Sequence, residues 1–142
     1  MERKIKKALV VLFVSLTVTT TARAAGKNTE KFDWGRVMDA IIMVESNGDA
    51  HAVRGTQCGA MQITPIMVRE CNIILKKQNK KKRFTLDDRF SIAKSKEMFL
   101  LFQSYHNPTN NVEKAIRSWN GGLNYSLKRT ERYYKKVLKA MK

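Results

Sequence analysis

The chain has 142 residues, of which 43% are hydrophobic, so it is long enough for one domain with a compact core and no more. Its 28 basic and 12 acidic side chains give a net charge of +16 at pH 7, which favours polyanionic partners. No internal repeat is visible. His51 and His106 are isolated and there is no CxxC pair, so we expect neither a metal site nor a cofactor.

The first 24 residues have the pattern of a secretory signal. A basic stretch at 1–7 precedes an apolar stretch at 8–18, and small residues around Arg23 provide a cleavage point. We therefore expect 1–24 to be a signal peptide and 25–142 to be an exported domain, in the periplasm or cell envelope. The apolar run is too short for a good membrane span, and an uncleaved amino-terminal anchor is the alternative.

Without residues 1–24, 23 basic and 11 acidic side chains remain, a net charge of +12. Nucleic acid is the usual partner of such a chain, but the export signal argues against it. Cell-wall polymers and anionic membrane surfaces are the polyanions outside the cytoplasm. The run from Lys76 to Arg83 (KKQNKKKR) is predicted to be a solvated loop, which either aids solubility or contacts wall or membrane.

The first predicted helix spans 34–46. Trp34, Met38 and Ile41 recur on it at helical spacing, and the next step of this apolar stripe is Glu45. Apolar surroundings disfavour the anionic form of a carboxyl group and raise its pKa, as a general acid near neutral pH requires. The alternative is a glutamate that tilts into solvent at the helix end.

The remaining elements are predominantly helical. Residues 47–63 are predicted to be irregular, with at most a short hairpin, and Thr64-Pro65 begins a helix that ends near Cys71. Thr85-x-x-Asp88 resembles a capping arrangement before a long helix that ends at Asn107-Pro108. The inner stripe of this long helix is predicted to be Ile92, Ser95, Phe99 and Phe102.

Two further helices are predicted. Asn110 or Asn111 caps the first, which ends at Gly121-Gly122, and Ser126 caps the second, which runs to about Met141. Cys58 and Cys71 are an even pair in an oxidising compartment. They either form a disulfide worth about 3 kcal/mol or remain two buried thiols.

Four short motifs in order resemble those of the lytic transglycosylase family, over residues 34–138. They are Glu45-Ser46, then Gly59-Ala60-Met61-Gln62-Ile63, then Trp119-Asn120-Gly121-Gly122, and finally Thr130-x-x-Tyr133 followed by Val137. The resemblance implies a mainly α, goose-type lysozyme fold, with at most a short β hairpin beside the catalytic helix. It also implies cleavage of the β-1,4 bond between N-acetylmuramic acid (MurNAc) and N-acetylglucosamine (GlcNAc) in peptidoglycan.

In that family one glutamate, here Glu45, first protonates the glycosidic bond and then takes a proton from the sugar's 6-hydroxyl, which leaves a 1,6-anhydro ring. Other glycosidases need a second carboxylate. The candidates here are Asp39, on another side of the helix, and Asp49, whose setting is that of a turn residue. The lack of an obvious partner for Glu45 is compatible with the family's mechanism.

The resemblance also implies a set of substrate-binding residues, each of which has an ordinary structural alternative. Ser46 binds an acetamido group or merely ends the helix, Met61 is a cleft wall or core, and Gln62 offers its amide to a sugar or to backbone. Asn120 shapes the cleft floor or ends a helix, and Tyr133 lies near the catalytic helix or is a core aromatic. The complete set is Ser46, Met61, Gln62, Trp119, Asn120 and Tyr133.

The chain departs from the family pattern at three positions, where Ala60 replaces Leu, Thr56 replaces Gly and Trp119 replaces Tyr. The family's tyrosine can bond the glutamate and an indole has a different reach, so Glu45 is expected to be held differently. We expect a monomer that acts on glycan strands, and the small size and the resemblance suggest a role in a phage, secretion or conjugation apparatus. The alternatives are a hydrolytic muramidase and a non-catalytic cationic protein that binds wall or membrane.

Overall fold

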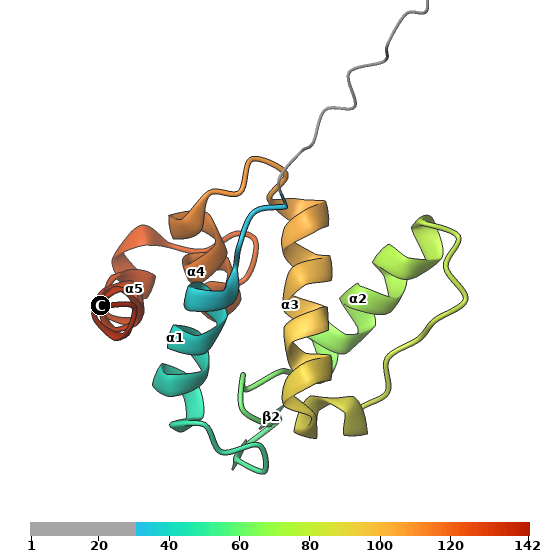
Figure 1. Ribbon diagram of the computed structural model, residues 1–142, viewed down its shortest axis with the longest axis horizontal. Helices are drawn as coiled ribbons and strands as arrows, with labels where there is room; N and C mark the ends of the chain where they lie inside the picture. Colours follow the sequence, from blue (N-terminus) through green and yellow to red (C-terminus); the bar gives the residue numbers. More distant parts are fainter. Residues whose placement is uncertain (1–30) are drawn as a thin grey trace, which may run out of the picture. The chain divides into compact units, whose positions relative to one another are not determined.

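The computed structural model describes residues 31–142, so the predicted signal peptide at 1–24 and the first residues of the predicted domain 25–142 lie outside the described residues. The described part is mainly helical, as predicted, and none of its helices has the length and apolarity that crossing a membrane requires. Its helices are α1 (Gly35–Ser46), α2 (Pro65–Lys77), α3 (Ile92–His106), α4 (Val112–Gly121) and α5 (Leu127–Ala140) (Figure 1).

A small hairpin follows α1, within the segment where the sequence allows one. Strand β1 (Val53–Arg54) pairs antiparallel with β2 (Gln57–Cys58), with Val53 opposite Cys58. Gly55 lies in the connecting turn at a φ of +59°, which glycine adopts without steric cost. A 3-10 helix, η1 (Asp87–Phe90), precedes α3.

Side-chain caps fix the starts of four helices. Oxygen atoms of Thr64, Ser91, Asn111 and Ser126 accept the backbone N–H three residues ahead, at 3.2, 3.3, 2.8 and 3.4 Å. The caps predicted at Thr64 and Ser126 are confirmed, and Asn111 is the cap of α4. At the start of α1 the Asp33 carboxylate accepts the Gly35 N–H at 2.8 Å.

Two predicted boundaries are wrong. Helix α2 continues past Cys71 to Lys77, because Ile74 and Leu75 are buried and extend its apolar face by another turn. The basic run therefore begins on a helix, and only its later part is loop.

The helix predicted directly after Thr85-x-x-Asp88 begins only at Ile92, with Ser91 as its cap. Asp88 accepts the Thr85 N–H at 2.8 Å, which is half of a capping box, and it closes the turn before η1. Ile92 is exposed, so it does not belong to the inner stripe, whereas Ser95, Phe99 and Phe102 are buried as predicted.

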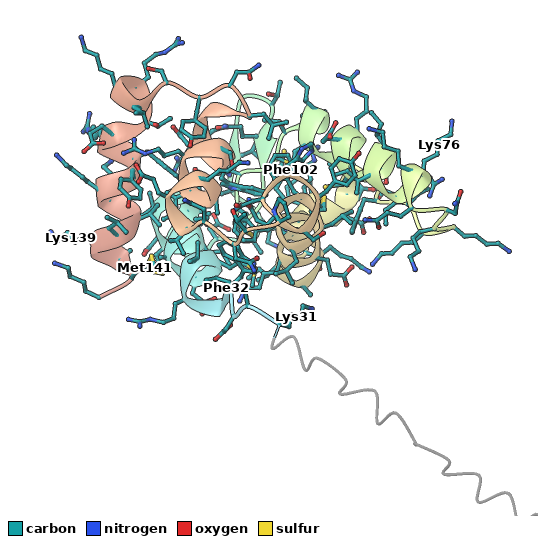
Figure 2. All side chains as sticks on the ribbon, turned by 90° about the horizontal axis from the view of Figure 1, so that it is seen from above. Lys31, Phe32, Lys76, Phe102, Lys139 and Met141 are labelled. Carbon is teal, nitrogen blue, oxygen red and sulfur yellow. The ribbon has the colours of Figure 1, made fainter. Side chains whose placement is uncertain are left out.

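The core lies where α3 meets its neighbours. Figure 1 shows α3 with α2 on one side and with α1 and α4 on the other, and α5 packs against both α1 and α4. One large, fully buried side chain comes from each of four helices, namely Ile41, Phe99, Ile116 and Val137. Phe102 points into this interior, while Lys76 and Lys139 mark opposite ends of the described part (Figure 2).

Of the two alternatives for the cysteine pair, the structure has the free thiols and not the disulfide. Cys58 and Cys71 are both buried free thiols, so the alternative of two packed thiols describes them. The Cys71 thiol donates to the Met98 carbonyl at 3.6 Å, and burial raises the pKa of Cys71 to about 12. Such a thiol stays protonated and unreactive while the fold persists.

Candidate active site

Glu45 lies in the last turn of α1, half buried, as the apolar stripe of that helix predicts. The Tyr133 hydroxyl on α5 donates to Glu45 Oε1 at 2.8 Å. Burial raises the pKa of Glu45, while the Tyr133 hydrogen bond and the positive charge of Arg54 offset part of that rise. Burial also raises the pKa of Tyr133, so its hydroxyl remains a donor.

Glu45 opens onto a cleft of about 430 Å³ between the end of α1, the hairpin, α4 and α5. Among the described residues that line this cleft, Glu45 provides the only carboxylate. The other two candidates point elsewhere: Asp39 pairs with Lys96 at 2.7 Å, and Asp49 accepts the His51 N–H at 2.8 Å within its turn. The described residues that line the cleft therefore offer one carboxyl group.

A second hollow of about 330 Å³ adjoins the first, because Gln57 and Asn120 line both. The two hollows form one groove, which we call the Glu45 groove, with a polar part around Glu45 and a more apolar part over α2 and α4. The apolar part is lined by Ile63, Met67, Phe102, Trp119 and Leu123. Glu70 lies at its edge and is held by His106 Nε2 at 2.8 Å.

Trp119 does not hydrogen-bond Glu45. Its indole N–H donates to the Met61 carbonyl at 3.1 Å, and its ring packs edge-on against Phe99 and Phe102. Tyr133 makes the bond to the carboxyl instead. Tyr133, which is expected to lie near this helix, therefore supplies the contact to Glu45, and Trp119 does not.

Gln62 has an unusual backbone and an incompletely paired amide. Its φ is +50°, and its Nε2 donates to the carbonyls of Gly59 at 2.9 Å and Ala52 at 3.2 Å. These bonds close the turn that lies between the hairpin and α2. The Oε1 atom is buried without a hydrogen-bond partner among the described residues, and Gln62 lines the apolar part of the groove.

Met61 and Ser46 do not line the groove. Met61 is 0% exposed, so the prediction that its side chain forms a cleft wall is wrong; the side chain belongs to the core beside Trp119. Ser46 donates its hydroxyl to the Ala60 carbonyl at 2.8 Å and ties the end of α1 to the Gly59–Ile63 motif. Its hydrogen is therefore engaged by backbone, which is the structural alternative.

Sequence reasoning missed the basic side of the groove. Around Glu45 the cleft is lined by Arg54 from β1 and by Arg129, Arg132 and Lys136 from α5. Arg129, Arg132 and Lys136 are spaced so that they share one face of α5, and this spacing is visible in the sequence. Which face of α5 meets the groove depends on how α5 packs against α1, and this is a tertiary property.

Comparison of the chain with known families, with curated proteins and with solved structures found no match. The chemistry of the Glu45 groove is therefore argued from its own residues.

Proposed function

We propose that the protein is a lytic transglycosylase that cleaves the MurNAc–GlcNAc bond of peptidoglycan, with Glu45 as its acid and base. The observation that carries the proposal is a half-buried carboxyl, held at 2.8 Å by Tyr133, in a groove whose cleft around it offers no other carboxylate. The four motifs in order support a goose-type lysozyme fold, and the signal-like pattern of residues 1–24 supports export to the cell envelope.

Glu45 would act in two steps. Its raised pKa makes the carboxyl more protonated at a given pH than it would be in water, so it can donate that proton to the glycosidic oxygen as the C1–O bond breaks. The carboxylate that results is stabilised by the Tyr133 hydroxyl and by the charge of Arg54. It then accepts the proton of the sugar's 6-hydroxyl as that oxygen bonds to C1, which restores the acid without consuming water.

The rest of the groove suits a glycan strand. Trp119 provides aromatic surface in the apolar part, and sugars pack on such surface through their C–H faces. Asn120 and Gln57 lie where the two parts join. Gln62 lines the groove and its buried Oε1 has no partner among the described residues, so a side-chain rotation that exposed this oxygen would offer an acceptor to a sugar N–H or O–H.

The proposal is tested by clearing of purified peptidoglycan with Glu45→Gln and with Asp39→Asn as the matched control. Both variants remove one carboxylate from α1, but Asp39 is exposed and pairs with Lys96 away from the groove. Glu45→Gln should slow clearing about 100- to 10,000-fold, whereas Asp39→Asn should remain within about twofold of wild type. Clearing by Glu45→Gln at the wild-type rate would instead identify a non-catalytic cationic protein.

A further inference from the structure

The polar part of the groove carries a strong excess of positive charge. Four basic side chains line it, Arg54, Arg129, Arg132 and Lys136, against the single carboxyl of Glu45. Burial already disfavours the ionised form of that carboxyl. The cations therefore repel one another across a concave surface with little internal compensation.

Several carboxylates elsewhere in the described part pair with other cations. Glu131 pairs with Arg117 at 2.6 Å and with Lys135 at 3.3 Å. It does not pair with Lys136, which follows Lys135 directly in the sequence. Glu113 likewise pairs with Arg117 at 2.7 Å. Within residues 31–142, no carboxylate lies within ion-pair distance of any of the four groove cations. A ligand that neutralises them must bring its own negative charges.

The cations are spread too widely for one acidic group. Arg129 and Lys136 are seven residues apart on α5, which corresponds to about 10 Å along the helix axis. A single carboxylate reaches only one end of this row. A segment with several carboxylates, such as an acidic peptide attached to the sugar, reaches the whole of it.

We propose that these four side chains bind the carboxylates of the peptide that peptidoglycan carries on MurNAc, so that the protein acts on peptide-bearing strands in preference to peptide-free ones. This inference rests on the proposed function. A peptide-free strand keeps only the lactyl carboxylate on each MurNAc. This group is also a carboxylate, but it extends less far from the sugar than the carboxylates of the peptide. The two sources of carboxylate are therefore separated by using both strands as substrates.

The test compares Arg132→Ala/Lys136→Ala with Lys128→Ala/Lys139→Ala. Both pairs remove two positive charges from α5, but Lys128 and Lys139 do not line the polar part of the groove. On peptide-bearing strands the groove pair should raise KM about 5- to 30-fold, with kcat little changed. On peptide-free strands it should change KM less than twofold, and the control pair should leave both substrates unaffected.

Three results would overturn the inference: equal effects of the two variant pairs, equal effects of the groove pair on both strands, or a wild-type protein that cleaves both strands equally well. Binding of uncut strands to the Glu45→Gln protein separates this failure from failure of the proposed function. If wild type cleaves neither strand but binding of the peptide-bearing strand still needs Arg132 and Lys136, the subsite stands and the enzymatic proposal falls. If wild type cleaves the strands but strand binding does not depend on Arg132 and Lys136, only the subsite inference is refuted.

Discussion

Replacement of Tyr133 by Phe removes the one side-chain hydrogen bond that Glu45 receives within residues 31–142 and leaves the ring in place. The bond is 2.8 Å long and its acceptor is a half-buried carboxyl group. Hydrogen bonds to charged groups contribute about 1.5–3 kcal/mol. This contribution belongs mainly to the ionised form of Glu45, because a carboxylate accepts more strongly than a carboxylic acid.

The sign of the pH effect follows from that preference. The Tyr133 hydroxyl lowers the pKa of Glu45, so Tyr133→Phe raises it and extends the protonated acid to higher pH. The stability that the bond contributes is present when Glu45 is ionised and is lost as pH falls through its folded pKa. The variant should therefore lose about 1.5–3 kcal/mol, or roughly 5–15 °C in Tm, at pH 8 and clearly less at pH 4.

The assay is the pH dependence of peptidoglycan clearing, with Tyr134→Phe as the matched control. Tyr134 is the next residue on α5, and its ring packs against the Arg117 guanidinium rather than Glu45. For Tyr133→Phe we expect the alkaline limb to move to higher pH and the maximal rate to fall about tenfold, since the carboxylate left after proton transfer is less stabilised. An unchanged profile, a limb moved to lower pH, or the same shift in Tyr134→Phe would refute this reasoning.

Three other predictions concern the frame of the groove. Gly59→Ala should destabilise the fold by about 3 kcal/mol, because the φ of Gly59 is +79° and a Cβ there would lie 1.7 Å from the Arg89 carbonyl oxygen. Gly55→Ala is the control, since there is open space around Gly55, and it should cost only about 1–2 kcal/mol. Both values are measured by thermal or urea unfolding. Trp119→Phe should cost about 1–3 kcal/mol, because the Met61 carbonyl loses its donor, yet leave the pH limb of clearing in place; a moved limb would mean that Trp119 also governs Glu45. A reductant should leave Tm unchanged, and thiol reagents should titrate Cys58 and Cys71 only after unfolding; a fall in Tm on reduction would reveal a bridge.

The sequence predicted those parts of the fold that local chemistry determines. The helix starts at Thr64 and Ser126 follow from capping side chains, and the burial of Phe99 and Phe102 follows from helical spacing. The predicted end of α2 near Cys71 is wrong, because burial of Ile74 and Leu75 carries the helix on to Lys77 and into the basic run. Tertiary packing overrides the local signal there.

Within the candidate site, local pattern placed Glu45 correctly but could not supply its surroundings. Its bond to Tyr133 spans 88 residues of sequence and exists because α5 packs on α1. Met61 and Gln62 are neighbours in one motif, yet Met61 faces the core and Gln62 lines the groove. The positive φ of Gln62 and the close approach of Gly59 to Arg89 set this local geometry, and apolar periodicity carries no information about either.

The most direct test of the central claim is the mass of the fragments released from purified peptidoglycan by wild type and by Glu45→Gln. The account predicts that wild type releases MurNAc ends lighter by one water than reducing ends, which is the mass of a 1,6-anhydro ring, and that Glu45→Gln releases almost none. Reducing ends from wild type would show a hydrolase on the same groove. Equal release of anhydro ends by both proteins would contradict the role of Glu45.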